Sequence, residues 1–563
     1  MTDLIIAPAK SAVSHHAAST KAASANTVST KSAVLDDAHV GDIRGALGTI
    51  KHGDTAARQG LSAKFKTLLA IVGPGLIVMC GDNDAGAFST YGQSGQNYGT
   101  HLLWVLLLLV PVLYVNQEMV VRLGAVTGVG HGKLIMERFG RFWGAFSVID
   151  LFLLNALTLV TEFIGITLAV GYLGLPKAPS VIAAGVVVIA AASTGSFRRF
   201  ERVVITLCAG SLLLIPIALM LHPTAGQMAH GFLVPQLPGG GGQEAAVMLL
   251  IIGLVGTTVA PWQLFFQQSY VIDKRITPRF IKYEKADLWI GIVVVVIGAA
   301  AIIGFAAAAV ANTGLAGHFS DAQGLAQAIS AKAGHVAGIL FAIALLDSSI
   351  IGAFAVSLST AYAAGDTLGI NHSLHRGVKQ AKGFYAVYVG LIGIAATIVL
   401  IPGSPLGLIT NGVQAMAGVL LPSASVYLLV LCNDKQVLGP WVNGRKTNLF
   451  TGSVLAVLVT LSIILTLAVL DPNLTAGQIL DIIEACGVLS LVFAGYALLS
   501  RRRRPAESID RASALDWRMP PLSVIGRAAM PTSRKVGMSI LRLYLALASV
   551  LVVVKIVQMA LRQ

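Results

Sequence analysis

Long apolar runs, separated by short polar segments, dominate the chain. A helix that crosses a bilayer needs about 20 predominantly apolar residues, and about twelve windows of the chain meet that criterion. The pattern therefore predicts an all-α polytopic membrane protein. We place its spans near 67–96, 101–121, 145–172, 179–196, 203–222, 246–271, 288–312, 334–364, 383–401, 407–432, 448–470 and 477–500.

The first and the sixth apolar runs are interrupted. The first, GPGLIVMCGDNDAGAFSTY (73–91), carries Asp82, Asn83 and Asp84 where the span should be deepest. The sixth, VMLLIIGLVGTTVAPWQLFFQQSYV (247–271), breaks at Gly, Thr and Pro. Interrupted helices at corresponding positions of two five-helix halves point to an inverted-repeat transporter with its site at the midplane. We therefore predict a first repeat at 67–222 and an inverted second repeat at 246–432.

The flanking segments complete the expected layout. Residues 448–500 add two spans, and the Ala/Ser/Thr-rich residues 1–66 predict a disordered cytoplasmic tail. Residues 501–563 predict a basic cytoplasmic tail with one further apolar stretch at 543–561. Lys555 interrupts that stretch, so both a thirteenth span and a helix lying in the interface fit it.

Composition and charge exclude several classes of protein. Charged residues make up 12% of the 563 residues, against about 25% in soluble domains. The four cysteines fall inside apolar runs without paired spacing, which argues against a disulfide framework or a metal cluster. The net charge of +14 does not indicate nucleic acid, because Lys and Arg gather in alternate loops, such as those of Arg138, Arg198, Lys274 and Arg376. The positive-inside rule places the amino terminus in the cytoplasm. We expect a multi-pass protein of the cell membrane, with the lipid bilayer as its partner, and we expect it to be a monomer.

The two breaks favour a cation. Unwinding a helix in lipid exposes carbonyl groups that need a partner, and Asp82, Asn83 and Asp84 add anionic and amide oxygens. The carboxyl ends of the first half-helices, near Gly81 and at Thr257 to Ala260, add negative dipole ends. The alternative is that the two aspartates only cap half-helices, but a carboxylate inside the membrane is functional by default.

These motifs resemble the Nramp (SLC11) family of divalent-metal transporters from about residue 73 to about residue 441. The first broken run resembles the family's first helix, and LGAVTG (123–128) resembles its loop after the second helix. GTTVAPWQLFFQQS (256–269) resembles the sixth helix, and NGVQAMAGVLLPSASVYLLVLCNDKQVLG (411–439) resembles the tenth. The resemblance implies a LeuT-like fold, with helices 1 and 6 broken and extra helices at the carboxyl end. It also implies transport of a metal ion without a cofactor and without enzymatic activity.

By this resemblance, Asp84 corresponds to the family's metal-binding aspartate. Gly86 is kept, whereas Ala87 replaces the metal-binding asparagine. Ala260 replaces the metal-binding methionine, and Trp262 replaces the histidine that follows it.

Four further positions carry over in the same way. Gln267 replaces a second histidine, Thr257 corresponds to the carbonyl donor, and Gln414 corresponds to the glutamine of the tenth helix. Glu162 corresponds to a glutamate of the proton route, whose partner aspartate is replaced by Leu159. We expect the outer waters of the ion to be contacted by Asp82, Asn83, Gln263 and Gln414.

The departures favour a hard ion. A methionine thioether is a soft ligand that favours transition metals, and Ala260 removes it. Mg²⁺ keeps several waters and needs one or two carboxylates in a roomier cavity. The pattern resembles the Nramp-related magnesium transporters and predicts facilitated, proton-uncoupled import of hydrated Mg²⁺, with Mn²⁺ as a second substrate.

Three alternatives stay open at this point. The first is proton-coupled Mn²⁺/Fe²⁺ uptake that uses Asp82 and Glu162. The second is a sodium-coupled carrier of a small solute, although two aspartates would repel a substrate carboxylate. The third is an intramembrane aspartyl protease that pairs the GD of CGDND with Asp347, which leaves the sixth break unexplained.

Overall fold

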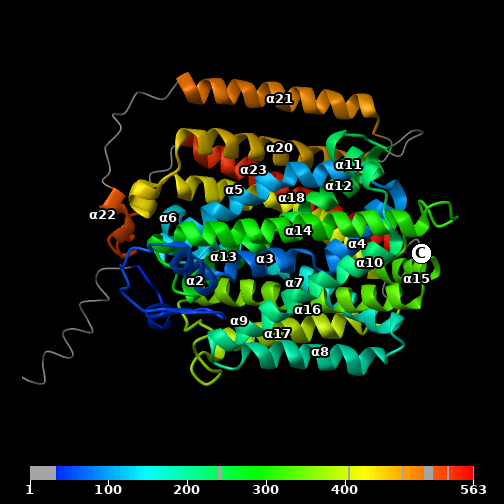
Figure 1. Cartoon of the computed structure of the whole chain (residues 1–563). Coiled ribbons are helices and arrows are strands. Elements are labelled where there is room, and N and C mark those ends of the chain that lie inside the picture. Colours follow the sequence, from blue (N-terminus) through cyan, green and yellow to red (C-terminus); the bar gives the residue numbers. More distant parts are fainter. Residues whose placement is uncertain are drawn as a thin grey trace, which may run out of the picture.

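The computed structural model describes residues 33–238, 244–403, 406–471, 474–499, 511–528 and 532–561. Long helices run roughly side by side through this part of the chain (Figure 1). Ten of its helices are long and apolar enough to cross a membrane, which makes the chain a multi-pass membrane protein. Within the described residues, β1 (Ile43–Arg44) pairs with β2 (Thr49–Ile50) in a two-stranded antiparallel sheet.

The first predicted repeat contains a helix in two pieces followed by five further helical stretches, the last of them formed by α9, η2 and α10. A short helix, α2 (Leu61–Ile71), precedes it and bends by 54° into α3. The repeat comprises α3 (Pro74–Asp82), α4 (Ala85–Tyr98), α5 (Leu103–Thr127), α6 (His131–Phe139), α7 (Arg141–Tyr172), α8 (Lys177–Ala192), α9 (Phe197–Cys208), η2 (Ala209–Leu213) and α10 (Leu214–Leu221).

The second predicted repeat has the same construction, after the connecting helix α11 (Ala225–Leu233). It comprises α12 (Glu244–Thr258), α13 (Pro261–Asp273), η3 (Pro278–Phe280), α14 (Ile281–Val310), α15 (Ala322–Ala333), α16 (His335–Leu368), α17 (Lys382–Val399) and α18 (Leu406–Cys432). The remaining elements are η1 (Asp37–His39), α19 (Lys435–Leu438), η4 (Gly439–Trp441), α20 (Arg445–Leu470), α21 (Ala476–Leu499), α22 (Arg511–Asp516) and α23 (Thr532–Leu561).

Both predicted breaks are present, and local chemistry explains where each helix restarts. Asp84 is the N-cap of α4, and its Oδ1 accepts a hydrogen bond of 2.9 Å from Ala87 N. Pro261 opens α13 in the first turn, where a missing N–H costs nothing. Each break therefore lies where a residue favours a helix start over helix continuation.

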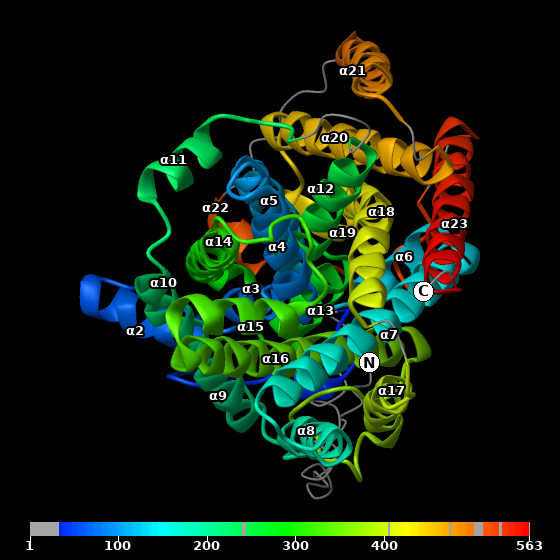
Figure 2. The ribbon, with the colours of Figure 1, turned by 90° about the vertical axis from the view of Figure 1, so that its right-hand side faces the viewer.

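The broken helices lie inside the bundle. α14 packs along α3 and α4, α7 packs along α16, and α12 packs along α18 (Figure 2). Glycines allow these close approaches, because a Cβ on Gly75 would lie 2.7 Å from Leu288 Cα of α14. By contrast, α21 lies at the edge of the molecule and exposes apolar side chains such as Phe493 (71%), as a lipid-facing helix does.

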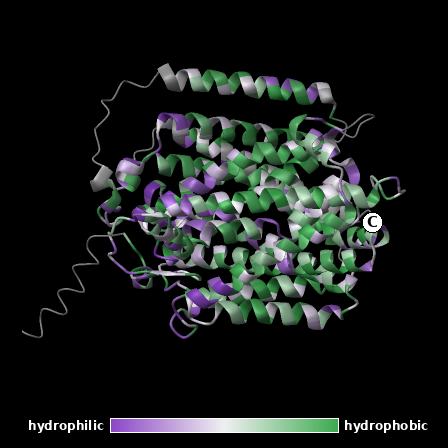
Figure 3. Cartoon of the chain, viewed as in Figure 1, coloured by the Kyte–Doolittle hydropathy of each residue, from purple (hydrophilic) through white to green (hydrophobic). Residues whose placement is uncertain are grey.

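Hydrophilic residues gather at one end of the molecule, around α2, α6 and α22 (Figure 3). We call this end the basic face and define it by Arg138, Arg198, Lys274 and Arg376. Residues 33–50 contact Arg198 and Arg376 directly, and they contact Glu201, the ion-pair partner of Lys274. Residues 511–528 contact Arg138. Residues that the sequence placed in alternate loops thus meet on one side.

The prediction of a disordered tail over residues 1–66 is wrong for residues 33–66. These residues form η1, β1, β2 and α2, because Ala33, Ile43 and Ile50 are buried in the hydrophobic core and the basic face binds the polar positions. Residues 1–32 lie outside the described part of the chain.

The described residues of the predicted carboxyl-terminal tail pack against the helix bundle. Met519 is buried and its N donates to Val126 O of α5 at 3.3 Å, while Arg501 to Arg504 lie outside the described residues. α23 contains the extra apolar stretch and packs against α18 and α20. Its Tyr544 hydroxyl lies 2.7 Å from Thr466 Oγ1 of α20, although α23 is not among the ten candidate spans of the described residues.

Candidate functional site

Two aspartates flank the first break and both are buried. Asp82 is 1% exposed at the end of α3, and Asp84 is 3% exposed at the start of α4. Gln263 of α13 donates to Asp82 Oδ1, and Gln117 of α5 donates to Gln263 Oε1 at 3.1 Å. A chain of side-chain amides thus links the first break to α13 and α5.

Glu162 lies beside the same break. It is fully buried in α7, and its Oε2 accepts a hydrogen bond of 3.2 Å from Ala85 N. Gly352 of α16 provides the room, since a Cβ there would lie 2.5 Å from Glu162 Oε2 and 3.0 Å from Asp84 Cβ. The structure therefore brings a third carboxyl group from α7 to the two aspartates.

The second break is less polar. Ala260 occupies the N-cap position of α13 in an extended conformation, and its side chain offers no ligand atom. Thr257 Oγ1 is buried and has no hydrogen-bond partner among the described residues. Trp262 packs within 3.5 Å of the Cβ position of Gly81, and its carbonyl accepts a hydrogen bond of 2.9 Å from Ser359. An apolar side chain and an indole thus line this side of the site.

Gln414 of α18 reaches both breaks. A Cβ on Gly86 would overlap its side-chain amide, and a Cβ on Gly256 would overlap its backbone carbonyl. Gln414 Nε2 has no hydrogen-bond partner among the described residues. Glycine at Gly86 and Gly256 therefore lets α18 approach both breaks, with the Gln414 amide beside Gly86.

Three further predicted residues lie at or near the breaks: Asn83, Gln267 and Ala87. Asn83 directs its Nδ2 to Val295 O of α14, at 3.3 Å, so its amide nitrogen binds the neighbouring helix. Gln267 is fully buried one turn beyond Gln263, and neither of its amide atoms has a partner among the described residues. Ala87 contributes its backbone N–H to the Asp84 cap.

Sequence reasoning missed three residues of the site. Gln117 stands in the run LYVNQEMV (113–120), where a polar residue within a span was a usable signal. Tyr91 donates to or accepts from Thr258 Oγ1 at 2.7 Å and ties α4 to α12. Gly352 has no sequence signal, because its role depends on a close approach of α16 to α7 that only the fold creates.

The electrostatics of the site require a compensating positive charge. Within the described residues, Asp82, Asp84 and Glu162 form no ion pair with Lys, Arg or His, and one oxygen each of Asp82 and Glu162 has no partner. Removing a carboxylate from water costs several kcal/mol, about 3 or more per ion, unless a cation or a proton compensates it. The oxygens of these groups are hard ligands, which suit a divalent cation.

The described residues contain no cluster of three or more His, Cys, Asp or Glu arranged to hold a metal ion. Carboxylates therefore supply only part of a coordination shell here. Amide and backbone oxygens of the breaks, and waters kept by the ion, would have to supply the rest.

Comparisons with known proteins find relatives over most of the chain. Residues 75–468 match the family model described as Nramp, natural resistance-associated macrophage protein-like. A divalent metal cation transporter MntH of Burkholderia ambifaria is 27% identical over 430 residues, which cover 72% of this chain and 90% of the relative. The MntH of Ralstonia nicotianae is 28% identical over 409 residues, covering 70% and 90%.

A solved structure shares the fold. The manganese transporter of Eremococcus coleocola, in complex with an aromatic bis-isothiourea substituted compound, superimposes with a TM-score of 0.60 at 19% identity. The match covers 79% of this chain and 96% of that protein. The fold is thus the LeuT-like fold of that transporter, with broken helices in both repeats.

The family match and the relatives make the chain a membrane carrier of divalent metal ions, not an enzyme. The metal ion is the substrate, and transport needs no cofactor. The chain belongs to the Nramp family, whose model matches more than two thirds of its length.

Proposed function

We propose that this carrier imports hydrated Mg²⁺, and Mn²⁺ as a second substrate, without coupling to protons. The observation that carries the proposal is the second break, where Ala260 and Trp262 stand in place of the side chains of a soft site. An ion there meets the oxygens of Asp84, Asp82, Thr257, Gln263 and Gln414 and no thioether. Hard oxygens with room for retained waters suit Mg²⁺ better than a transition metal.

The driving force and the orientation follow from charge. Loops rich in Lys and Arg face the cytoplasm, so the basic face and the amino terminus lie inside in our proposal. A membrane potential is worth about 2.3 kcal/mol per charge per 100 mV, which doubles for a dication. The potential alone then accumulates the ion, and a monomer suffices because both breaks belong to one chain.

A second candidate is proton-coupled uptake of Mn²⁺ or Fe²⁺. Two observations favour it: the curated relatives are named divalent metal cation transporters, and the solved relative is a manganese transporter. In addition, Glu162 lies against the Asp84 break, where a carboxyl group can exchange a proton. In that case Glu162 would be the residue that gains or loses a proton when the metal binds.

Uptake into proteoliposomes with a trapped pH indicator separates the candidates. The purified chain is supplied with Mg²⁺, Mn²⁺ or Ca²⁺ under an inside-negative potential. The first candidate expects Mg²⁺ and Mn²⁺ uptake with no change of internal pH. Metal-driven acidification that Glu162→Gln abolishes would instead establish the second candidate.

Metal choice is tested at Ala260. Ala260→Met restores a thioether and is expected to raise the ratio of Mn²⁺ to Mg²⁺ transport about tenfold, close to 1.4 kcal/mol. The matched control is Ala260→Leu, which adds similar volume without sulfur. If both variants change the ratio equally, volume and not ligand softness sets the selectivity.

A further inference from the structure

Residues 33–50 lie across the basic face and contact helices of both repeats. On the first repeat they contact α9: Arg198 Nε donates to Gly45 O at 2.9 Å, and Arg202 Nε donates to Ala46 O at 3.0 Å. Val34 packs on Gly128, the C-cap of α5. We call residues 33–50 the latch segment.

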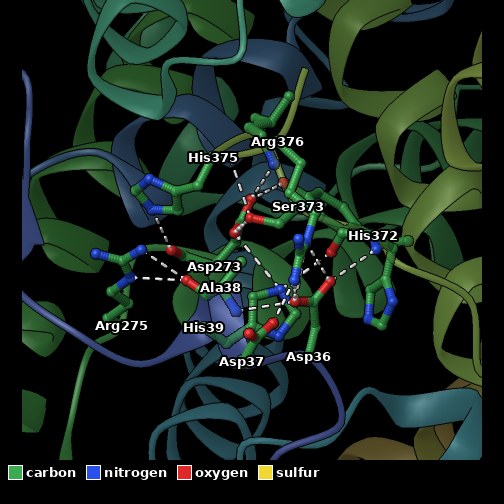
Figure 4. A network of polar contacts seen from close by, with 12 residues as sticks. Asp36, Asp37, Ala38, His39, Asp273, Arg275, His372, Ser373, His375 and Arg376 are labelled. Atoms are coloured by element: carbon green, nitrogen blue, oxygen red, sulfur yellow. Dashed lines mark hydrogen bonds and ion pairs between the residues drawn. The ribbon is translucent and has the colours of Figure 1, made fainter. Parts of the chain in front are cut away.

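On the second repeat, the latch segment contacts the ends of α13 and α16 (Figure 4). Arg275 donates to Ala38 O at 2.7 and 2.9 Å, directly after α13. Arg376, in the loop after α16, pairs with Asp36 at 2.7 Å and also with Asp37. His372 N donates to Asp36 Oδ2 at 3.0 Å.

The side chains at the centre of this contact are buried. Asp36, His39, Asp273 and His372 are all buried, and His39 Nε2 lies 3.0 Å from His372 O and 3.5 Å from Asp273 Oδ1. Figure 4 shows these side chains converging from the latch segment, α13 and the loop after α16. Charged groups are buried at a protein surface only when other segments cover and pair them, so the latch segment seals this part of the face.

Hydrogen bonds also connect the latch segment to the first broken helix. Ala46 N donates to Glu201 Oε2, and Glu201 Oε1 accepts from Lys274 Nζ at 2.6 Å. Lys274 Nζ also donates to Val72 O, two residues before α3 begins, at 2.8 Å. The segment therefore joins α9, the end of α13 and the start of α3 through consecutive hydrogen bonds.

We propose that the latch segment holds the basic face closed, and that it must detach from both repeats, from α5 and α9 as well as from α13 and the loop after α16, before the transported ion can leave on that side. A carrier with this fold exposes its midplane site to either side by moving one repeat against the other. A segment hydrogen-bonded to both repeats opposes that motion until its contacts break. The inference does not depend on which metal ion is carried.

A reversible disulfide tests whether detachment is required. The Cβ position of Gly128 lies 3.8 Å from Val34 Cβ, within the range for a disulfide. In Val34→Cys/Gly128→Cys, oxidation is expected to slow Mn²⁺ uptake at least tenfold, and a reductant should restore it. The single variants Val34→Cys and Gly128→Cys receive the same treatment, which controls for the native cysteines and for the positive φ of Gly128. Equal uptake by the oxidised and reduced double variant overturns the proposal.

A second measurement needs no transport and therefore separates failure of the latch from failure of the proposed function. Nitroxide labels on Val40 and Val378, both surface-exposed, report the distance between the latch segment and the loop after α16. Arg376→Gln removes the pairs with Asp36 and Asp37 and should raise the long-distance population at least fivefold. Arg44→Gln removes an equal charge from the exposed side of the same segment, where Arg44 lies 3.5 Å from Asp42, and should leave the distances unchanged. Identical distributions in both variants also overturn the proposal.

Discussion

Two sets of buried carboxylates, one at the helix breaks and one at the basic face, have opposite surroundings. Within the described residues, Asp82, Asp84 and Glu162 at the breaks have no cationic side chain within ion-pair distance. At the basic face, Glu201 pairs with Lys274 at 2.6 Å, and Asp36 pairs with Arg376 at 2.7 Å.

The presence or absence of a cationic partner indicates different roles for the carboxylates at the breaks and those at the basic face. A carboxylate that already has a cationic partner stabilises one arrangement of helices, whereas a carboxylate without one needs a bound cation or a proton to offset its burial. Substitutions at the two places should therefore affect different measurements. At the basic face they should change stability and conformation, and at the breaks they should change transport.

The largest expected effect is on stability at the basic face. Lys274→Met leaves Glu201 buried without its partner and should lower the free energy of unfolding by about 3–5 kcal/mol. Thermal unfolding in detergent measures this loss. The control is Lys285→Met, which breaks the partly exposed pair with Glu118 at 2.8 Å and should cost less than about 1 kcal/mol. Equal losses in the two variants would show that burial of the pair is irrelevant.

The opposite result is expected at the breaks. Asp84→Asn keeps an N-cap for α4 but removes the negative charge, so metal uptake should fall at least thirtyfold, about 2 kcal/mol, without loss of thermal stability. Asp347→Asn changes a carboxyl group of α16 that lies against Gly210 of η2 and should keep most of the uptake. Uptake by Asp84→Asn at the wild-type rate would remove the site from the mechanism.

The sequence predicted the breaks because their signals are local. Polar residues within an apolar run, followed by a residue that starts a helix, identify a break without any knowledge of neighbours. Asp84, Ala260 and Pro261 therefore stand at the breaks, as expected. The overall architecture followed from hydropathy for the same reason.

The latch segment was not predicted because its order depends on distant partners. Ala33, Ile43 and Ile50 show no helical or strand period, so composition alone indicated disorder. The segment is ordered because Arg198, Arg275 and Arg376, far apart in sequence, meet it on one face. The hydrogen bond from Asn83 Nδ2 to Val295 O of α14 could not be predicted for a similar reason, since the local sequence does not show where α14 lies.

A smaller effect is expected from crowding the carboxyl groups of the breaks. Gly352→Ala places a methyl group 2.5 Å from Glu162 Oε2, which should cost about 1–3 kcal/mol in stability through overpacking and should lower uptake. Gly393→Ala in α17, where nothing lies within 4 Å of the Cβ position, is the matched control and should be neutral or stabilising. Unfolding curves and initial uptake rates of the two variants are compared. If Gly352→Ala behaves like Gly393→Ala, then Glu162 does not need its present position.

The smallest effect is a pH dependence of the latch. Burial lowers the pKa of His39, although Asp273 acts in the opposite direction. Burial also lowers the pKa of His372, but the charge and hydrogen bond of Asp366, together with Ile370 O and Asp36, outweigh it and raise the pKa of His372 to about 9. The charged groups that face His39 come from its own segment, from α13 and from the end of α16 and its loop: Asp36, Asp273, Asp366, His372 and His375.

His39 links attachment of the latch to pH, whereas His372 contributes little, because the groups that chiefly raise the pKa of His372, Asp366 and Ile370, stay beside it when the latch detaches. Burial in the latch contact lowers the pKa of His39, which returns to its ordinary value of about 6.5 on detachment. Attachment should therefore weaken as pH falls below about 6.5, by at most about 1.4 kcal/mol per pH unit. The Val40–Val378 label distance measured from pH 5.5 to 8.5 should show a detached population that is constant above pH 6.5 and rises below it. In His39→Gln the rise on the acid side should disappear, and a detached population that falls steadily with acidification would contradict the assignment of His39.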